Sequence, residues 1–288
     1  MRPKRCIAMR HPDWLKTNPF KDTRQTKQLL RGFRVNTVCE EARCPNRSHC
    51  FSKPTATFMI LGNSCTRTCG FCSVNHAHTL TPEDSEPERV AQAAQSMGLR
   101  HVVITSVTRD DLDDGGARHF ARTVLAVRAC LPDATIEVLT PDFKGDTEAL
   151  KTVLDAAPDV FNHNVETVPS LYPVVRPQAQ YRRSLRMLEA ARELCPQMKT
   201  KSGLMLGLGE SIDECIDVLR DIAATGCNFM TIGQYLRPGK DNLPVVEYVH
   251  PDVFDRLRDS AMTMGFEFVA SAPLVRSSYN AEEMTGHR

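Results

Sequence analysis

Short apolar runs alternate with amphipathic stretches along most of the chain after residue 55. TATFMIL is a nearly continuous apolar run of strand length, so it predicts a buried strand. Val90, Ala94 and Met97 recur at helical spacing in EPERVAQAAQSM, so this stretch predicts a helix. The alternation predicts strands at 55–61, 101–107, 135–140, 160–167, 201–207, 228–235 and 266–271, and helices at 86–97, 115–131, 146–157, 181–195, 211–226 and 252–265.

The stretch SIDECIDVLRDIAATG gives the clearest helix signal. Ser211 and Glu214 have the spacing of a capping box, and Gly226 is a typical residue at a helix end. Between them an apolar stripe follows helical spacing through Ile212, Cys215, Ile216, Leu219, Ile222 and Ala223. We therefore expect a helix that begins after Ser211 and ends at Gly226.

The order of these elements predicts an α/β fold. Repeated strand–helix alternation is typical of a parallel sheet, and six or more units favour a partial or full TIM-like (βα) barrel. We expect the barrel over residues 55–271, with an N-terminal extension at 1–54 and a C-terminal extension at 272–288. Functional groups of such barrels lie at the C-terminal ends of the strands. CTRTCGFC (65–72) and GLGE (207–210) each follow a strand, so they should share one rim.

Composition and charge argue against a nucleic-acid-binding, a membrane-spanning or a secreted protein. The 288 residues are 41% hydrophobic and 25% charged with a formal net charge of +1, so no basic excess points to nucleic acid. No apolar run of about 18 residues is present, so no membrane span is expected. The basic N-terminus lacks the apolar core of a secretory signal.

Cysteine usage indicates metal chemistry rather than disulfides. The chain has 11 cysteines, an odd number, and six of them form two triplets within residues 39–72. A secreted disulfide scaffold would be shorter and richer in cysteine. We therefore expect a reducing, cytoplasmic environment.

The downstream triplet is Cys65, Cys69 and Cys72, with gaps of three and two residues. Thiolates suit zinc and iron–sulfur clusters. His76 could complete a Cys3His zinc site, which would fit an interaction or nucleic-acid module. Alternatively, three thiolates on a cubane cluster leave one iron free to bind a substrate or cofactor.

The upstream triplet is Cys39, Cys44 and Cys50, with gaps of four and five residues. A ferredoxin-like cluster would need a fourth thiolate, and the remaining cysteines offer no obvious candidate. His49 is adjacent to Cys50, although this spacing is awkward for two ligands of one site.

The motif C-x3-C-x-F-C at the end of the first barrel strand, with Phe71 before the last cysteine, resembles the radical S-adenosylmethionine (SAM) superfamily. The resemblance implies that a [4Fe–4S] cluster on Cys65, Cys69 and Cys72 binds and cleaves SAM to give a 5′-deoxyadenosyl radical. It also implies further contacts with SAM. These are Gly207, Gly209 and Glu210 at the methionine amino group, and Asn164 and Glu166 at the ribose hydroxyls.

Both triplets together with RSSYNA (276–281) are similar to the lipoyl synthase family. TVCEEARCPN, TATFMILG, TSVTRDDL, DGGA and YRRSL match as well, over roughly residues 11 to 285. The resemblance implies a second, auxiliary [4Fe–4S] cluster on Cys39, Cys44 and Cys50. Its fourth ligand would be a serine of RSSY, which we place at Ser278, although the residues themselves leave Ser277 open.

The family implies an enzyme that inserts sulfur at C6 and C8 of an octanoyl-lysine on a carrier domain. The sulfur would come from the auxiliary cluster. Expected carriers are dehydrogenase E2 subunits and the glycine cleavage H protein, with a ferredoxin or flavodoxin as electron donor and an iron–sulfur carrier for cluster repair. No nucleic-acid or membrane partner is expected. Biotin synthase or methylthiotransferase types are the alternative within the superfamily, but they lack this order of triplets followed by RSSY.

The sequence departs from the family pattern at four places. RSH precedes Cys50 and Phe51 follows it, where the family usually has a glycine and an acidic residue, and then Trp. Pro54 replaces the usual Gly before TATF, and Asp113 replaces the Pro after TRDDL. None of these changes removes a proposed ligand.

Overall fold

The computed structural model describes residues 11–16, 21–53, 55–279 and 281–285, and one sheet organises them. Its eight strands lie in the order β1 to β8. All neighbours from β2 onward are parallel, and β1 pairs antiparallel with β2 at the edge. The strands are β1 (Asn36–Thr37), β2 (Thr57–Ile60), β3 (His101–Ser106), β4 (Thr135–Leu139), β5 (Val160–Asn162), β6 (Lys199–Leu206), β7 (Phe229–Gln234) and β8 (Phe268–Ser271).

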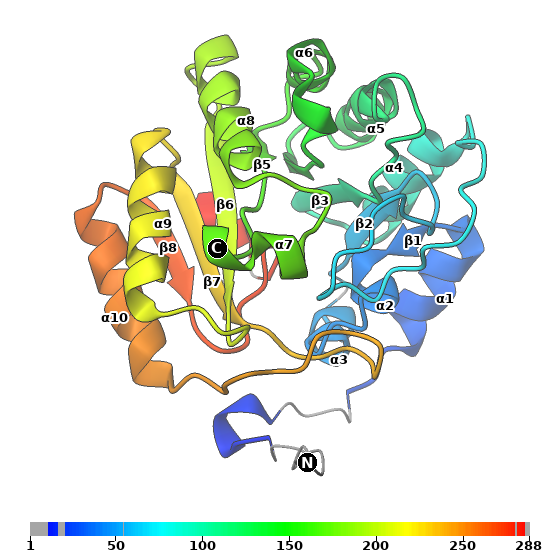
Figure 1. Ribbon diagram of the computed structural model, residues 1–288. Coiled ribbons are helices and arrows are strands. Elements are labelled where there is room, and N and C mark those ends of the chain that lie inside the picture. The colour runs from blue at the N-terminus through cyan, green and yellow to red at the C-terminus, as the bar shows by residue number, and fades with distance from the viewer. Residues whose placement is uncertain (1–10, 17–20, 54, 280, 286–288) are drawn as a thin grey trace.

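Helices cover the outer face of this curved sheet (Figure 1). Those between or before the barrel strands are α4 (Glu86–Ser96), α5 (Ala117–Cys130), α6 (Thr147–Asp155), α8 (Tyr181–Leu194), α9 (Ile212–Ala224) and α10 (Pro251–Thr263). Shorter elements complete the chain: α1 (Arg24–Phe33), α2 (Val38–Glu41), α3 (Arg47–Phe51), α7 (Tyr172–Val175) and four 3-10 turns at Asp13–Leu15, Phe143–Gly145, Pro169–Leu171 and Ala281–Thr285. The predicted TIM-like class is confirmed as a partial barrel, because the strand order is linear rather than closed.

The predicted elements agree with the structure in type, with one local exception. The capping box of Ser211 and Glu214 is confirmed, since each side chain accepts the other residue's backbone N–H. The strand predicted over 160–167 is wrong beyond Asn162. Beyond it only an isolated bridge between Glu166 and Leu204 continues the pairing with β6, and Glu166 has a left-handed backbone with a φ of 72°.

The N- and C-terminal parts of the described chain meet at the open side of the barrel. The Asn46 side-chain amide donates to the Leu274 carbonyl at 2.7 Å, and the rings of His49 and Tyr279 lie 5.9 Å apart. The C-terminal segment approaches β7 so closely that a Cβ on Gly233 would stand 2.2 Å from the Val275 carbonyl oxygen. Glycine is therefore required where the two segments cross.

A buried ionic cluster fills part of the barrel interior. Lys201 donates to both carboxylate oxygens of Glu137 at 2.9 and 3.1 Å, and the Asn162 amide donates to the same carboxylate at 2.8 Å. His101 lies 3.3 Å from it. Burial acts to raise the pKa of Glu137, but the Lys201 charge and the His101 contact lower it to about 2. The carboxylate is therefore charged although it is fully buried.

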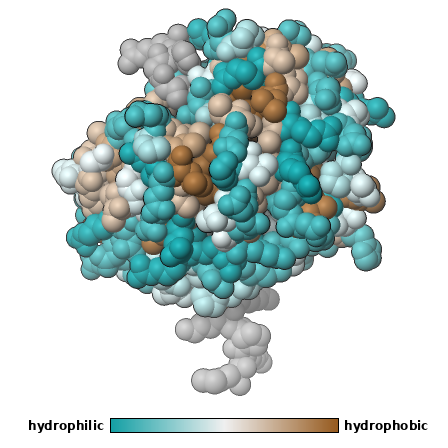
Figure 2. Space-filling model, turned by 90° about the horizontal axis from the view of Figure 1, so that it is seen from above, coloured by the Kyte–Doolittle hydropathy of each residue, from teal (hydrophilic) through white to brown (hydrophobic). Residues whose placement is uncertain are grey.

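The surface is ordinary for a globular protein. Figure 2 shows a face on which hydrophilic residues dominate and apolar side chains form small separate groups. Within the described ranges, no helix is both long enough and apolar enough to cross a membrane.

We expect Glu137→Gln to lower the free energy of unfolding by about 3–5 kcal/mol, because it leaves the buried Lys201 ammonium without its counter-charge. Urea unfolding followed by circular dichroism measures this change. The matched control is Asp155→Asn, which breaks the exposed Lys151 pair on α6 and should cost no more than about 0.5 kcal/mol. Equal effects of the two variants would contradict the importance of the buried pair.

We also expect the stability difference between the native chain and Glu137→Gln to depend on pH. The folded pKa of Glu137 lies below its ordinary value of 4.5, so its contribution is fully present above about pH 4.5. It is lost as the pH falls toward 2. The difference in stability between the native chain and Glu137→Gln should shrink over that window.

Candidate functional site

A cavity of about 420 Å³ opens inside the barrel and brings together residues from distant parts of the sequence. Its volume is in the range of small-molecule sites. The predicted site residues that line it are Cys39, Cys44, Cys50, Cys72, Asn164, Glu166, Ser277 and Ser278. Thus the upstream triplet, one residue of the downstream triplet and the RSSY segment face one space.

Two short helices position the upstream triplet. Cys39 lies on α2 and Cys50 on α3, with Cys44 in the turn between them. The Cys44 amide donates to the Cys39 carbonyl at 3.1 Å. Burial, and then the nearby Cys44 thiol, raise the pKa of Cys39 to about 12 and that of Cys50 to about 11. These thiols need a cationic partner to ionise, and metal binding supplies one.

The two serines of RSSY have different surroundings. The Asn164 side-chain amide donates to Ser277 Oγ at 2.6 Å. No comparable hydrogen bond to Ser278 Oγ is seen within the described ranges of the chain. Ser278 and Cys50 both line the main cavity and also a second, smaller cavity of about 40 Å³. Both serines therefore border the upstream triplet at the main cavity, and Ser278 alone of the two also lines the smaller cavity with Cys50.

The downstream triplet lies in the loop after β2. The Cys65 amide donates to the Asn75 carbonyl at 2.8 Å, and the Cys72 amide donates to the Cys69 carbonyl at 3.1 Å. Burial is the main cause that raises the pKa of Cys69 and that of Cys72, the latter to about 12. The neighbouring thiols add to the effect at both residues, so the three cysteines lie close together.

The described side chains do not form a ready-made site for a single zinc ion. Among the described residues, no three His, Cys, Asp or Glu side chains are arranged to hold a single metal ion. Sulfur ligands of one tetrahedral zinc would be roughly 3.8 Å apart, given Zn–S bonds of about 2.3 Å. A cubane cluster takes one thiolate per iron, so its ligands are more widely spaced. The Cys3His alternative with His76 gains no support from this arrangement.

The predicted glycine-rich element is ordered but lies outside the cavity lining. Glu210 accepts the backbone N–H of Gly207, and that of Leu208 at 3.0 Å, so its carboxylate organises its own turn. A Cβ on Gly207 would stand 2.1 Å from the Gln234 side chain, and the φ of 98° also favours glycine. The turn approaches the β7 side of the barrel closely, and Gly209 shares its left-handed backbone with a φ of 120°.

Asn164 and Glu166 do line the cavity. The Asn164 amide donates to Glu166 at 3.0 Å, while its buried Oδ1 has no partner among the described residues. Burial raises the pKa of Glu166 and Arg176 opposes that rise. An orphaned acceptor beside a buried carboxylate is suited to hold a ligand hydroxyl or amine.

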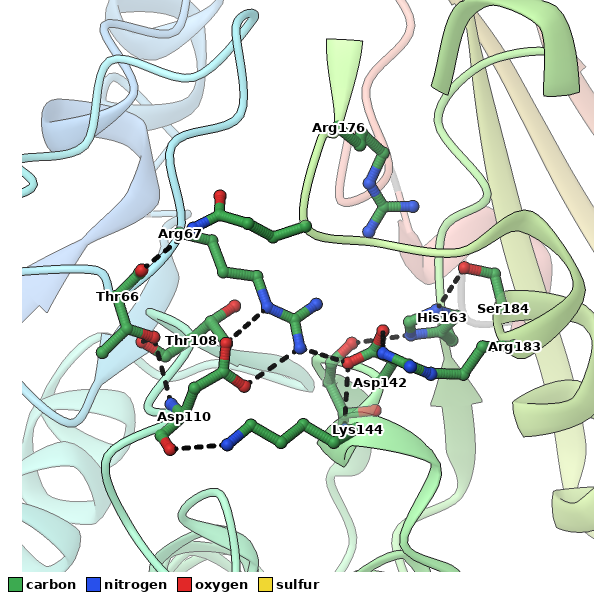
Figure 3. Close-up of polar contacts among 12 residues, drawn as sticks. Thr66, Arg67, Thr108, Asp110, Asp142, Lys144, His163, Arg176, Arg183 and Ser184 are labelled. Carbon is green, nitrogen blue, oxygen red and sulfur yellow. Dashed lines mark hydrogen bonds and ion pairs between the residues drawn. The ribbon is translucent and has the colours of Figure 1, made fainter. Parts of the chain in front are cut away.

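Sequence reasoning missed Arg176, which is buried beside the downstream triplet. Its Nη1 donates to the Asn164 and Val165 carbonyls at 3.1 and 3.0 Å, but its buried Nε has no partner in the described chain. Its charge acts to lower the pKa of Cys69. Figure 3 shows its guanidinium apart from the ion pairs drawn around Arg67. A buried cation without a carboxylate pair is suited to bind an anion. No motif around VVRPQ indicates this role.

Comparisons with known proteins agree with this geometry. Residues 59–222 match the model of the Radical SAM superfamily. The chain is 52% identical over 276 residues to a lipoyl synthase of Alkaliphilus metalliredigens, with 95% of each chain covered. It is 54% identical over 280 residues to a lipoyl synthase of Nitratidesulfovibrio vulgaris, with 96% of this chain and 92% of the relative covered.

Solved structures show the same fold at low identity. Methylornithine synthase superposes with a TM-score of 0.57 at 15% identity, covering 91% of this chain and 82% of its own. A maturase of the [FeFe]-hydrogenase superposes with a TM-score of 0.56 at 12% identity, covering 92% and 74%. With a radical SAM match over more than half of its length and relatives of this similarity, the chain belongs to the lipoyl synthase family of radical SAM sulfurtransferases.

Proposed function

We propose that this enzyme inserts two sulfur atoms into a protein-bound octanoyl chain at the cavity described above. Cys65, Cys69 and Cys72 would hold the cluster that cleaves SAM. The upstream triplet and a serine of RSSY would hold the auxiliary cluster. The observation that carries the proposal is the shared cavity, because both triplets contribute to its wall together with Ser278.

The residues fit two clusters by the chemistry of their donors. Each triplet offers three thiols in partly buried surroundings, and neither is used in a disulfide. When bound, the cleaving cluster reduces SAM to a hydrogen-abstracting radical, and the auxiliary cluster supplies the two sulfur atoms. Apolar side chains line the space between the two sets of cysteines, namely Val38, Phe71, Leu139, Leu204, Met205, Leu236 and Val275. They exclude water from the reacting carbon atoms.

Three residues are arranged to hold SAM beside Cys72. Arg176 would offer the Nε–H of its guanidinium, which has no partner in the described chain, to the methionine carboxylate. Asn164 Oδ1 and Glu166 offer acceptors to the ribose hydroxyls. The turn formed by Gly207, Gly209 and Glu210 would contact SAM through its shape and its backbone groups. The Glu210 carboxylate is not available for this contact, because it already accepts backbone N–H groups of the turn.

The environment of the serines supports Ser278 as the oxygen ligand. Ser277 is engaged by Asn164, so moving it onto the auxiliary cluster would break a 2.6 Å hydrogen bond. Ser278 faces both cavities beside Cys50 and has no such bond to lose. An oxygen ligand binds iron less tightly than a thiolate. Ser278 is therefore suited to a cluster that has to release sulfur.

The proposal extends to partners, location and domain organisation. The octanoyl-lysine would come from lipoyl carrier domains such as E2 subunits and the H protein, electrons from a ferredoxin or flavodoxin, and replacement clusters from an iron–sulfur carrier. All ten described cysteines are free thiols, which fits a reducing cytoplasm. Residues 1–54 and 272–288 would act as extensions that supply auxiliary ligands to the barrel at 55–271.

Anaerobically prepared protein should contain about eight irons per chain and convert an octanoylated carrier peptide to its dihydrolipoyl form in the presence of SAM and dithionite. Eight irons follow from two cubanes of four. Iron and sulfide analysis and mass spectrometry of the peptide measure these results. Stoichiometric zinc, or a peptide of unchanged mass with all clusters present, would contradict the proposal.

Ser278→Ala should lower the dihydrolipoyl yield by at least tenfold, because the auxiliary cluster loses its oxygen ligand. Cleavage of SAM should continue, since the other triplet is untouched. The matched control is Ser277→Ala, which removes a hydroxyl of the same size and should retain most of the yield. The assignment would be reversed by a loss confined to Ser277→Ala.

Arg176→Met should weaken SAM binding by roughly tenfold to a hundredfold, in line with about 1.5–3 kcal/mol for a hydrogen bond to a charged group. Equilibrium dialysis with labelled SAM gives the dissociation constant. Arg258→Met is the control, because Arg258 pairs with the exposed carboxylates of Asp255 and Asp259 on α10. If both variants bind SAM like the native enzyme, Arg176 does not hold the carboxylate.

A further inference from the structure

Arg67 lies between the first two cysteines of CTRTCGFC and is the centre of a buried ion network (Figure 3). Its guanidinium donates to both Asp110 oxygens at 2.7 and 3.0 Å and to Asp142 at 2.6 Å. Only 5% of the Arg67 side chain is exposed, and the Asp142 side chain is fully buried. One arginine therefore ties the cysteine loop to the loops that follow β3 and β4.

Further contacts fix the Asp142 carboxylate and the backbone of Asp110. Asp142 accepts the Lys144 amide at 3.1 Å and pairs with Arg183 at 3.3 Å. Burial acts to raise the pKa of Asp142, but the Arg67 guanidinium lowers it to about 2, so it stays charged. The Lys144 ammonium donates to the Asp110 carbonyl at 2.9 Å. Arg67 is thus held by a rigid frame rather than by mobile surface carboxylates.

Thr66 joins the cysteine loop to the loop after β3 through its backbone and its hydroxyl. Its amide and its hydroxyl both donate to the Thr108 carbonyl at 3.0 Å. The hydroxyl also accepts the Asp110 amide at 3.0 Å. The segment after Cys65 is therefore in fixed register with residues 108–110.

This register places two backbone N–H groups against the sulfur of Cys65. The Thr108 amide donates to Cys65 Sγ at 3.3 Å, and the Arg67 amide does so at 3.5 Å. Hydrogen bonds to cluster sulfurs are among the factors that set reduction potentials. An added electron makes the cluster and its thiolates more negative, so an N–H dipole stabilises the reduced form more than the oxidised form.

We propose that Thr66, Arg67 and Asp110 are positioning residues that hold the Thr108 amide on Cys65 Sγ and thereby raise the reduction potential of the cluster on that triplet. The proposal rests on the assignment of Cys65, Cys69 and Cys72 to the cleaving cluster. Loss of the contact between the loops makes this cluster harder to reduce, so less SAM is cleaved at a given strength of reductant.

The test compares Thr66→Val with Thr68→Val in the full chain loaded with iron and sulfide. Both variants replace a hydroxyl by a methyl group of similar size, between the same two cysteines. The Thr68 hydroxyl is exposed and, among the described residues, donates only to Gln178, at 3.2 Å, so its loss leaves the Thr108 contact intact. A redox titration followed by electron paramagnetic resonance gives the potential. The cleaving cluster is identified as the one whose signal changes when SAM is added.

In Thr66→Val we expect the reduced-to-oxidised ratio of the cleaving cluster to fall about tenfold at a fixed potential, equal to about 59 mV for one electron. Thr68→Val should keep the native potential. Arg67→Met and Asp110→Asn should shift it in the same direction as Thr66→Val. An unchanged potential in Thr66→Val, or an equal shift in Thr68→Val, overturns the proposal.

Amide hydrogen exchange of the metal-free protein provides a readout that needs no cluster. Exchange of peptides containing Thr108 should be faster in Thr66→Val than in Thr68→Val, because only the former loosens the contact between the loops. Equal exchange rates overturn the inference even where a variant fails to take up iron. A native enzyme that holds no iron on the downstream triplet contradicts the proposed function itself, so the two failures are distinguishable.

Discussion

The open side of the barrel is the constraint on which the site depends. A closed TIM-type barrel of eight parallel strands fills its interior with layers of its own side chains. In this fold the strand order runs from β1 to β8 without closing. The gap admits segments from both ends of the described chain, and the Asn46 amide binds the Leu274 carbonyl where they meet. Because these segments enter from the side, cysteines near residue 40 and serines near residue 278 line one cavity.

The buried charges inside the barrel differ in whether they have an ionic partner. Lys201 and Glu137 neutralise each other inside the sheet. Arg176 is also buried and donates to the Asn164 carbonyl, but it forms no ion pair within the described chain. Asn164 Oδ1 in the cavity lining and the Nε of the nearby Arg176 are two of the buried polar atoms that find no partner in the described chain. Such groups are costly for an empty protein and favourable once an anionic ligand with hydroxyl groups fills the space.

Much of this arrangement could be read from the sequence because the decisive patterns are local. Cysteine spacing within 39–50 and 65–72 places each proposed set of ligands in one short segment, and the strand–helix alternation predicts the barrel. The end of β5 at Asn162 was missed, since VFNHNVET has the composition of a strand. Arg67 and Arg176 were missed for a different reason. The carboxylates that hold Arg67 lie 43 and 75 positions away, and no local pattern reports such contacts.

The choice between Ser277 and Ser278 shows what the structure adds to a motif. The two residues are chemically identical and adjacent, so sequence alone leaves both open. Their surroundings differ because the cavity wall gives one of them a partner, the Asn164 amide, and leaves the other beside Cys50. A hydroxyl that already accepts a short hydrogen bond gains less from binding iron than a free one. In the proposed assignment the Asn164 side chain would therefore engage Ser277, and Ser278 would be the serine that binds the auxiliary cluster.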